Sequence, residues 1–164
     1  KHLQFFIFTI LLSFFWTTSV SAQPCPEGGE VWTARTAAEL NAWNSITYGN
    51  GMFVAVSGGG INRVMTSTDG INWVSRVATA ASTWRSVAFG NGTFVAVAST
   101  GTDRVMTSTD GINWTLRTAA EPNAWRSVTF GNGMFLAVAA NGTNRVMTST
   151  DGISWTPQAS ASNV

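Results

Sequence analysis

The chain of 164 residues is poor in the side chains that most often carry catalysis. It contains one Cys, one His, one Lys and one Tyr. A single Cys excludes an intrachain disulfide and a thiolate metal cluster. Charged residues make up only 10% of the chain, and the formal net charge is +1. The sequence therefore gives no electrostatic reason to expect a nucleic acid or an anionic membrane as a partner.

The N-terminal segment has the layout of a secretory signal peptide. Lys1 and His2 form a basic start, an apolar run follows, and Val20-Ser21-Ala22 supplies the small residues of a cleavage site. The apolar run is shorter than the roughly 20 residues that a bilayer span needs. We expect residues 1–22 to be a signal peptide, residues 23–31 a linker, and the mature protein to be secreted, periplasmic or on the cell surface. A permanent N-terminal membrane anchor is the alternative.

Cleavage after Ala22 would remove the only Lys and the only His. The mature chain would then lack the His-based triads and Lys nucleophiles of many enzymes, and Cys25 would have no His partner. Eight Arg and eight acidic residues would remain, so the formal charge would be zero. We therefore expect no catalytic residue, no cofactor and no metal in this chain, and no membrane partner for the mature form.

What the sequence does contain is a repeat of 41 residues. Two series of tryptophans recur at this spacing, namely Trp43, Trp84 and Trp125, and Trp32, Trp73, Trp114 and Trp155. Three units align without a gap over residues 43–83, 84–124 and 125–164. Because "VWTAR" before the first unit matches "NWTLR", we also expect a lone strand over residues 32–37.

Each unit predicts four short strands. The first strand, such as "WRSVTF" at 125–130, ends at Gly-Asn-Gly, which is typical of a tight hairpin. The second, "MFLAVA" at 134–139, is apolar throughout, so we expect it to be buried on both faces. A Gly-rich link leads to the third strand, and a turn leads to the fourth. Repeats of this size and strand content predict an all-β fold of tandem four-stranded antiparallel blades, as in a β-propeller. A β-trefoil is the alternative.

The turn before the fourth strand carries one motif three times. "TSTDGINW" occurs at 66–73 and 107–114, and "TSTDGISW" ends at Trp155. Asp can accept hydrogen bonds from the backbone N–H groups that follow it, Gly tolerates the required backbone angles, and Trp buries a large surface. We assign this structural role to Ser67, Asp69, Gly70, Trp73, Ser108, Asp110, Gly111, Trp114, Ser149, Asp151, Gly152 and Trp155. A catalytic or metal-binding role for the three Asp is the alternative, although the same acid in every unit is what a requirement of the fold predicts.

The motif resembles the Asp-box, the bacterial neuraminidase repeat of sialidase-like β-propellers, in a shorter form. It is similar to the variant that accompanies "GNGxFVAV" in exported bacterial propellers, and the resemblance covers residues 32–158. It implies that the turn joins the third and fourth strands on the face opposite the ligand site. Sialidases use an arginine cluster and a tyrosine nucleophile. Tyr48 aligns with Phe89 and Phe130 in the repeat, so we expect a core aromatic and transfer no catalytic role.

Two sets of residues remain as candidates for function. Arg63, Arg104 and Arg145 precede the third strand of each unit, and we expect them to form a partial ring on the ligand face that meets an acidic ligand. Exposed or locally paired arginines are the alternative. Glu39, Glu121 and Asp103 could supply a pair of carboxylates for glycoside cleavage, and solvated loop acids are the alternative there.

Three units are fewer than the four to eight blades of a closed propeller, and the next Trp of the series would fall just beyond Val164. We therefore expect a fragment of a longer exported protein, whose open blade edges meet further blades or self-associate. The favoured function is a non-enzymatic binding or scaffold module for a glycan or a surface protein. The alternatives are the N-terminal part of a sialidase-like glycoside hydrolase with catalytic residues outside this chain, and a complete lectin of trefoil type.

Overall fold

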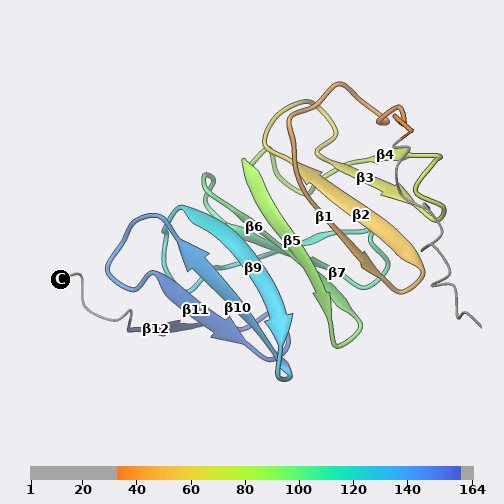
Figure 1. The fold of residues 1–164 in the computed structure, drawn as a ribbon. Helices are drawn as coiled ribbons and strands as arrows, with labels where there is room; N and C mark the ends of the chain where they lie inside the picture. The colour runs from red at the N-terminus through yellow and green to blue at the C-terminus, as the bar shows by residue number, and fades with distance from the viewer. Residues whose placement is uncertain (1–32, 160–164) are drawn as a thin grey trace, which may run out of the picture. The chain divides into compact units, whose positions relative to one another are not determined.

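A computed structural model describes residues 33–159 of the chain. Twelve strands form three four-stranded antiparallel sheets (Figure 1), in one compact unit that starts at Arg35. This part of the chain contains no helix with the length and apolar character of a membrane span. The predicted signal peptide at 1–22 and linker at 23–31 lie outside the described residues.

Each sheet is built from one repeat, and its strands pair in chain order. The first sheet contains β1 (Trp43–Gly49), β2 (Met52–Ser57), β3 (Val64–Ser67) and β4 (Val74–Arg76). The second contains β5 (Trp84–Gly90), β6 (Thr93–Ala98), β7 (Val105–Ser108) and β8 (Thr115–Arg117). The third contains β9 (Trp125–Gly131), β10 (Met134–Ala139), β11 (Val146–Ser149) and β12 (Thr156–Gln158). The prediction of tandem four-stranded antiparallel blades is confirmed. The trefoil alternative is wrong, because no strand of one repeat joins the sheet of another.

The hairpin between the first two strands of each sheet has a local cause. Asn50 and Gly51 both have positive φ, at 49° and 74°, and Gly49 pairs with Met52 across the turn. Asn and Gly are the residues that adopt such angles at least cost. The turn fixes the register that brings the alternating side chains of β1 and β2 to common faces of the sheet.

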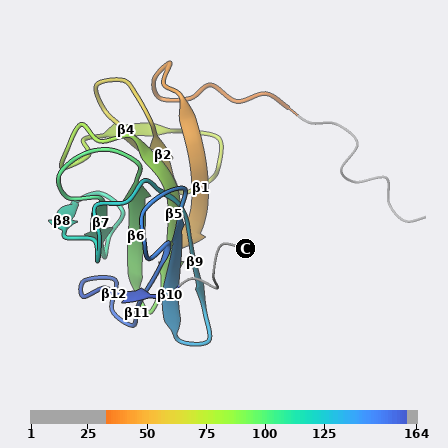
Figure 2. The same cartoon turned by 90° about the vertical axis from the view of Figure 1, so that its left-hand side faces the viewer.

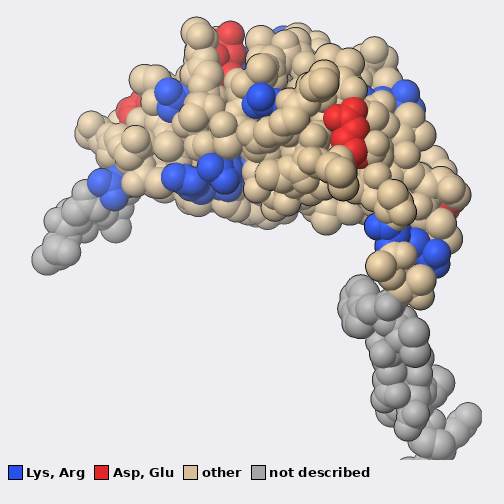
Figure 3. All heavy atoms as spheres, turned by 90° about the horizontal axis from the view of Figure 1, so that it is seen from above, with Lys and Arg blue, Asp and Glu red and all other residues tan. Residues whose placement is uncertain are grey.

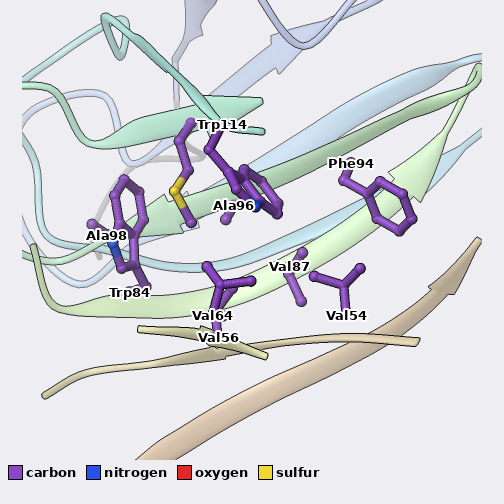
Figure 4. Close-up of a cluster of buried hydrophobic side chains, with 10 residues drawn as sticks. Val54, Val56, Val64, Trp84, Val87, Phe94, Ala96, Ala98 and Trp114 are labelled. Carbon is purple, nitrogen blue, oxygen red and sulfur yellow. The ribbon is translucent and has the colours of Figure 1, made fainter. Parts of the chain in front are cut away.

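The apolar core lies between the sheets. Val54, Val56 and Val64 of the first sheet point toward Trp84 and Val87 of the second (Figure 4), and all five are buried. An equivalent cluster joins the second sheet to the third. Because a four-stranded sheet of this size cannot bury its faces alone, each blade depends on its neighbour for stability.

The first strands of the three sheets lie side by side, in the order β1, β5, β9 (Figures 1 and 2). Serine side chains join them. The amide of Val87 donates to Ser45 Oγ at 3.2 Å, and the amide of Val128 donates to Ser86 Oγ at 3.1 Å. These bonds repeat at the same position of each joint, so the blades are stacked in one register.

Three expectations about the ends of the array need correction. Residues 33–37 form no strand and join none of the three sheets. The lone strand expected over 32–37 is therefore absent from the described part of that range. The second strand is buried on both faces in β6, but alternate residues of β10, including Leu136 and Val138, are more than one-third exposed. Tyr48, expected in the core, is 57% exposed. Tyr48 lies on the outer face of the first sheet and the exposed residues of β10 lie on the outer face of the last. No further blade of the described chain covers these two faces.

Candidate functional site

The loops of the blades gather at two opposite ends of the strands. The hairpin turns and the turns with the repeated Asp (67–73, 108–114 and 149–155) lie at one end, here called the Asp-turn end. The Gly-rich links (58–63, 99–104 and 140–145) and the connections between sheets lie at the other, here called the link end. This division follows from antiparallel pairing in chain order.

At the Asp-turn end, each Asp is an acceptor that closes its own turn. Asp69 Oδ1 accepts hydrogen bonds from the backbone N–H groups of Ile71 and Asn72, both at 2.8 Å. The hydroxyl of Ser67 donates to Asp69 Oδ1 at 2.9 Å and accepts from the amide of Gly70 at 2.9 Å. Gly70 has φ of 70°. The same pattern recurs around Asp110 and around Asp151.

These hydrogen bonds hold the carboxylates in the ionised form. The backbone N–H of Asn72 is the main cause that lowers the pKa of Asp69 well below its ordinary range. The N–H of Asn113 does the same for the pKa of Asp110, and that of Ser154 for the pKa of Asp151. A general acid at neutral pH needs a raised pKa. The geometry therefore gives these three Asp a structural role and makes them poor proton donors.

In the second and third blades, the Asp turn also docks the blade on the one before it. A Cβ added to Gly111 would lie 2.8 Å from a methyl group of Val54 in the preceding sheet, so glycine is needed for the close approach. Asn50 of the first hairpin donates to the carbonyl of Thr109 at 3.4 Å. Trp114 is buried, and its Nε1 donates to Gly111 O at 3.1 Å. The turn is thus a joint between blades as well as a turn.

Glu39 and Glu121 have a role that the sequence did not reveal. Glu39 accepts hydrogen bonds from the side chains of Ser75 and Asn62, both at 2.6 Å. Glu121 accepts from Asn144 at 2.6 Å. Each Glu thus ties the connection before its sheet to the Gly-rich link of the same sheet. The sequence signal for this role was a Glu-x-Asn-x-Trp spacing with a second Asn 23 residues after the Glu, which occurs before the first and the third sheet and not before the second.

The same bonds make the Glu pair unsuitable for acid catalysis. The hydroxyl of Ser75 is the main cause that lowers the pKa of Glu39, and the amide of Asn144 is the main cause that lowers the pKa of Glu121. Asp103, the third candidate acid, accepts from the hydroxyl of Thr118 at 3.3 Å. Each acid is bound within its own blade. No group of three His, Cys, Asp or Glu that could hold a metal occurs in residues 33–159.

The link end is basic. Of the eight arginines, seven lie at a strand terminus that points to this end: Arg63, Arg76, Arg85, Arg104, Arg117, Arg126 and Arg145. The acids of the Asp turns lie at the opposite end. Basic side chains are spread over this face in Figure 3, with acidic side chains between them. The sequence prediction covered only Arg63, Arg104 and Arg145, which precede the third strand of each sheet. It did not include the arginines at the start of a first strand or at the end of a fourth strand, although these strand ends lie at the same end of the sheet.

Arg63, Arg104 and Arg145 share one local geometry. In each, Nε donates to the carbonyl of a glycine three residues earlier, at 3.0–3.1 Å, and the side chain is half-buried. Arg63 also donates from Nη1 to Ser82 O at 2.7 Å, so its guanidinium holds the connection to the second sheet. The guanidinium groups of Arg104 and Arg145 make no second hydrogen bond with the described residues. Their Nη atoms are therefore available to a ligand, and the partial ring stays a prediction.

Comparison with protein families gives one match. The family model described as DUF6242 beta propeller domain matches residues 77–164, which is more than half of the chain. No protein of curated function matches the chain in sequence.

Several solved structures share the arrangement of blades. YCF48 from Cyanidioschyzon merolae is 20% identical with a TM-score of 0.55, over 71% of this chain and 37% of that one. Virginiamycin B lyase from Staphylococcus aureus is 18% identical with a TM-score of 0.64, over 73% of this chain and 41% of that one. A structure described as YCF48 bound to D1 peptide is 18% identical with a TM-score of 0.56, over 71% of this chain and 40% of that one. The chain thus spans about two-fifths of the length of these structures, and the likeness shows the fold alone.

Proposed function

The chain belongs to the family of the DUF6242 beta propeller domain, and from this membership we propose that it is a non-enzymatic binding or scaffold module. Its ligand is an acidic protein or glycan that meets the link end of the blades. Acidic here means that the ligand carries carboxylate or sulfate groups, which guanidinium groups bind well.

The observation that carries this proposal is the separation of charge along the strands. Seven arginines lie at the link end and the three Asp of the repeated turns lie at the other. Seven arginines against Glu39, Asp103 and Glu121 leave the link end with a net positive charge, which raises the local concentration of acidic ligands and speeds their association. The Nε bond to a glycine carbonyl also fixes the orientation of Arg104 and Arg145, which reduces the entropy lost when a ligand binds.

The known partners of similar folds support a protein ligand. YCF48 has been solved with a D1 peptide, and a further structure of similar fold, 13% identical with a TM-score of 0.53, is described as a nidogen/laminin complex. In both cases the fold occurs in a complex with a peptide or a protein. A glycan ligand for this chain rests on the arginines alone.

Three finer points belong to the same proposal. We propose that the repeated turn is of the Asp-box type of sialidase-like propellers, which its hydrogen bonds support. We propose that the protein is exported, which rests on the sequence of residues 1–22. We also propose that the three blades are part of a larger propeller, since a closed ring has four to eight blades; its further blades belong to a longer protein or to a second copy of this chain.

Binding to two defined acidic probes tests the proposal. Immobilised heparin carries sulfate groups and polyglutamate carries carboxylates. We expect the purified chain to bind at least one of them, with an affinity that falls as salt is added. Arg104→Gln should weaken this binding about tenfold. Arg35→Gln removes the same charge outside the three sheets and serves as the matched control. Equal losses in the two variants, or no binding to either probe, would contradict a ligand site at the link end.

A further inference from the structure

The third sheet leaves an apolar face uncovered by the described chain. Met134, Leu136 and Val138 of β10 are 37–38% exposed. In the second sheet the residues equivalent to Leu136 and Val138 are Val95 and Val97, which are fully buried against the third sheet. The face that forms one half of a blade joint is therefore open at this end of the array.

The first sheet leaves the other half of the same joint uncovered. Ile46 and Tyr48 of β1 are 55% and 57% exposed. Val87, the equivalent of Ile46 in the second sheet, is 5% exposed and packs in the cluster between the first two sheets. The two open faces are thus opposite halves of an interface that the chain already forms twice.

A glycine and an aromatic ring make this interface specific. A Cβ on Gly49 would overlap the ring of Phe89 in the next sheet, and a Cβ on Gly90 would overlap the ring of Phe130. Gly131 is the next glycine in this series, and it has no atom within 4 Å of the position of its missing Cβ. The space beside Gly131, here called the socket, is open in the described chain, whereas an aromatic ring fills the equivalent space at Gly49 and at Gly90.

Tyr48 is the ring that fits this socket. It occupies the position of Phe89 and Phe130 in the repeat, and its centroid lies 4.7 Å from that of Phe53. The equivalent rings in the second and third sheets have centroid distances of 4.6 and 4.8 Å. Tyr48 therefore already has the placement within its sheet that Phe89 and Phe130 have, without a glycine opposite it in the described chain.

Polar groups complete the match between the two faces. The amide of Val87 donates to Ser45 and that of Val128 to Ser86. The next serine is Ser127, which is exposed, and the residue at the position of Val87 on the open first sheet is Ile46. One copy can thus offer the serine and another the amide, as in the two joints within the chain.

We propose that two copies of this chain associate head to tail, with the third sheet of each packed on the first sheet of the other. Each interface repeats the joint seen between successive sheets, with Tyr48 in the socket at Gly131 and Leu136 against the face that carries Ile46. An interface between unlike faces either closes into a ring or continues as a filament. Two copies close a ring of six blades, within the four to eight of closed propellers.

Sedimentation velocity of the purified full chain over a concentration series tests this proposal. We expect a reversible species with twice the mass of one chain. Leu136→Arg and Ile46→Arg place a charge in the apolar interface from either side, and each should raise the dissociation constant at least about 100-fold. Gly131→Val should act in the same way by filling the socket. Both faces are open in the single chain, so circular dichroism should show all three variants folded.

Leu40→Arg is the matched control, because Leu40 is fully exposed and lies outside both faces. It should associate like the unmodified chain. Residues 1–32 are present in the unmodified chain and in every variant, so they cannot cause a difference between these proteins. A mixture of Leu136→Arg with Ile46→Arg should recover association, since one intact interface remains between the two variants. A monomer at every concentration, open polymers instead of a dimer, association that survives Leu136→Arg, or an inert mixture would each overturn the proposal.

Discussion

At the scale of single residues, the repeated Asp acts through the hydrogen bonds it accepts. Asp69 and Asp110 each bind two backbone N–H groups that no other part of the turn satisfies. The acid recurs because the turn recurs. Its constancy in the three repeats thus has a cause in the fold, and a search for function begins with the residues around it.

The depressed pKa of the three Asp predicts how stability depends on pH. In the unfolded chain the ordinary pKa is 3.8, and in the folded protein it is lower, so the unfolded state binds more protons at acidic pH. The stabilisation is complete above the unfolded pKa and is lost as the pH falls below it toward the folded pKa. We expect the urea midpoint to be constant from about pH 7 to 5 and to fall between about pH 4 and 2.

Asp110→Asn supplies the control for this pH dependence. Asn cannot ionise, so the variant should be less stable at neutral pH and should lose less stability on acidification. A midpoint that rises as the pH falls, or a variant with the full pH dependence of the unmodified protein, would show that the turns are not the source.

At the scale of elements, the Glu that ties a link to its sheet is present in two blades and absent from the third. Ala80 stands in the connection before the second sheet, at the position that Glu39 and Glu121 occupy before the first and the third. Glu121→Ala should therefore free the link at 140–145, because its bonds to Asn144 are lost. We expect faster amide exchange there, measured by mass spectrometry.

The other two links act as internal controls for that exchange experiment. Exchange at 58–63, which keeps Glu39, and at 99–104, which has no such Glu, should not change in Glu121→Ala. A uniform increase in all three links would indicate a general loss of stability, and an unchanged link at 140–145 would refute the role of Glu121.

Elements were predictable from the sequence where the cause is local. The Asn-Gly hairpin and the four-strand repeat follow from residues close in the chain, and the structure has both. Burial of β10 and of Tyr48 was not predictable from the repeat, because it depends on which neighbour a sheet has. The bonds of Glu39 to Asn62 were missed for a similar reason, since they join loops 23 residues apart. Of the seven link-end arginines, the sequence prediction covered only Arg63, Arg104 and Arg145.

At the scale of the whole molecule, stability comes from the joints between sheets. Trp84 is fully buried between the first and second sheets, whereas Trp43, at the same position of the first repeat, is only half-buried. Trp84→Ala should lower the free energy of unfolding by about 3–5 kcal/mol. Trp43→Ala should cost clearly less at protein concentrations low enough to keep the chain monomeric, since one face of its sheet is open in the monomer.

Equilibrium unfolding in urea measures both Trp variants. Equal losses for Trp43→Ala and Trp84→Ala would mean that the core lies within each sheet, contrary to the packing seen here. A single transition for the unmodified chain would show that the three sheets unfold together, as their shared cores require.

We propose that the two ends of the blades have different tasks, in which the Asp turns stabilise the fold and the link end binds the ligand. The most direct test compares Asp110→Asn with Arg104→Gln for binding to heparin and polyglutamate and for the urea midpoint. We expect Asp110→Asn to lose stability but to bind as the unmodified chain does, and Arg104→Gln to lose binding while its midpoint changes little. Loss of binding in Asp110→Asn with unchanged stability would contradict this division of roles between the two ends.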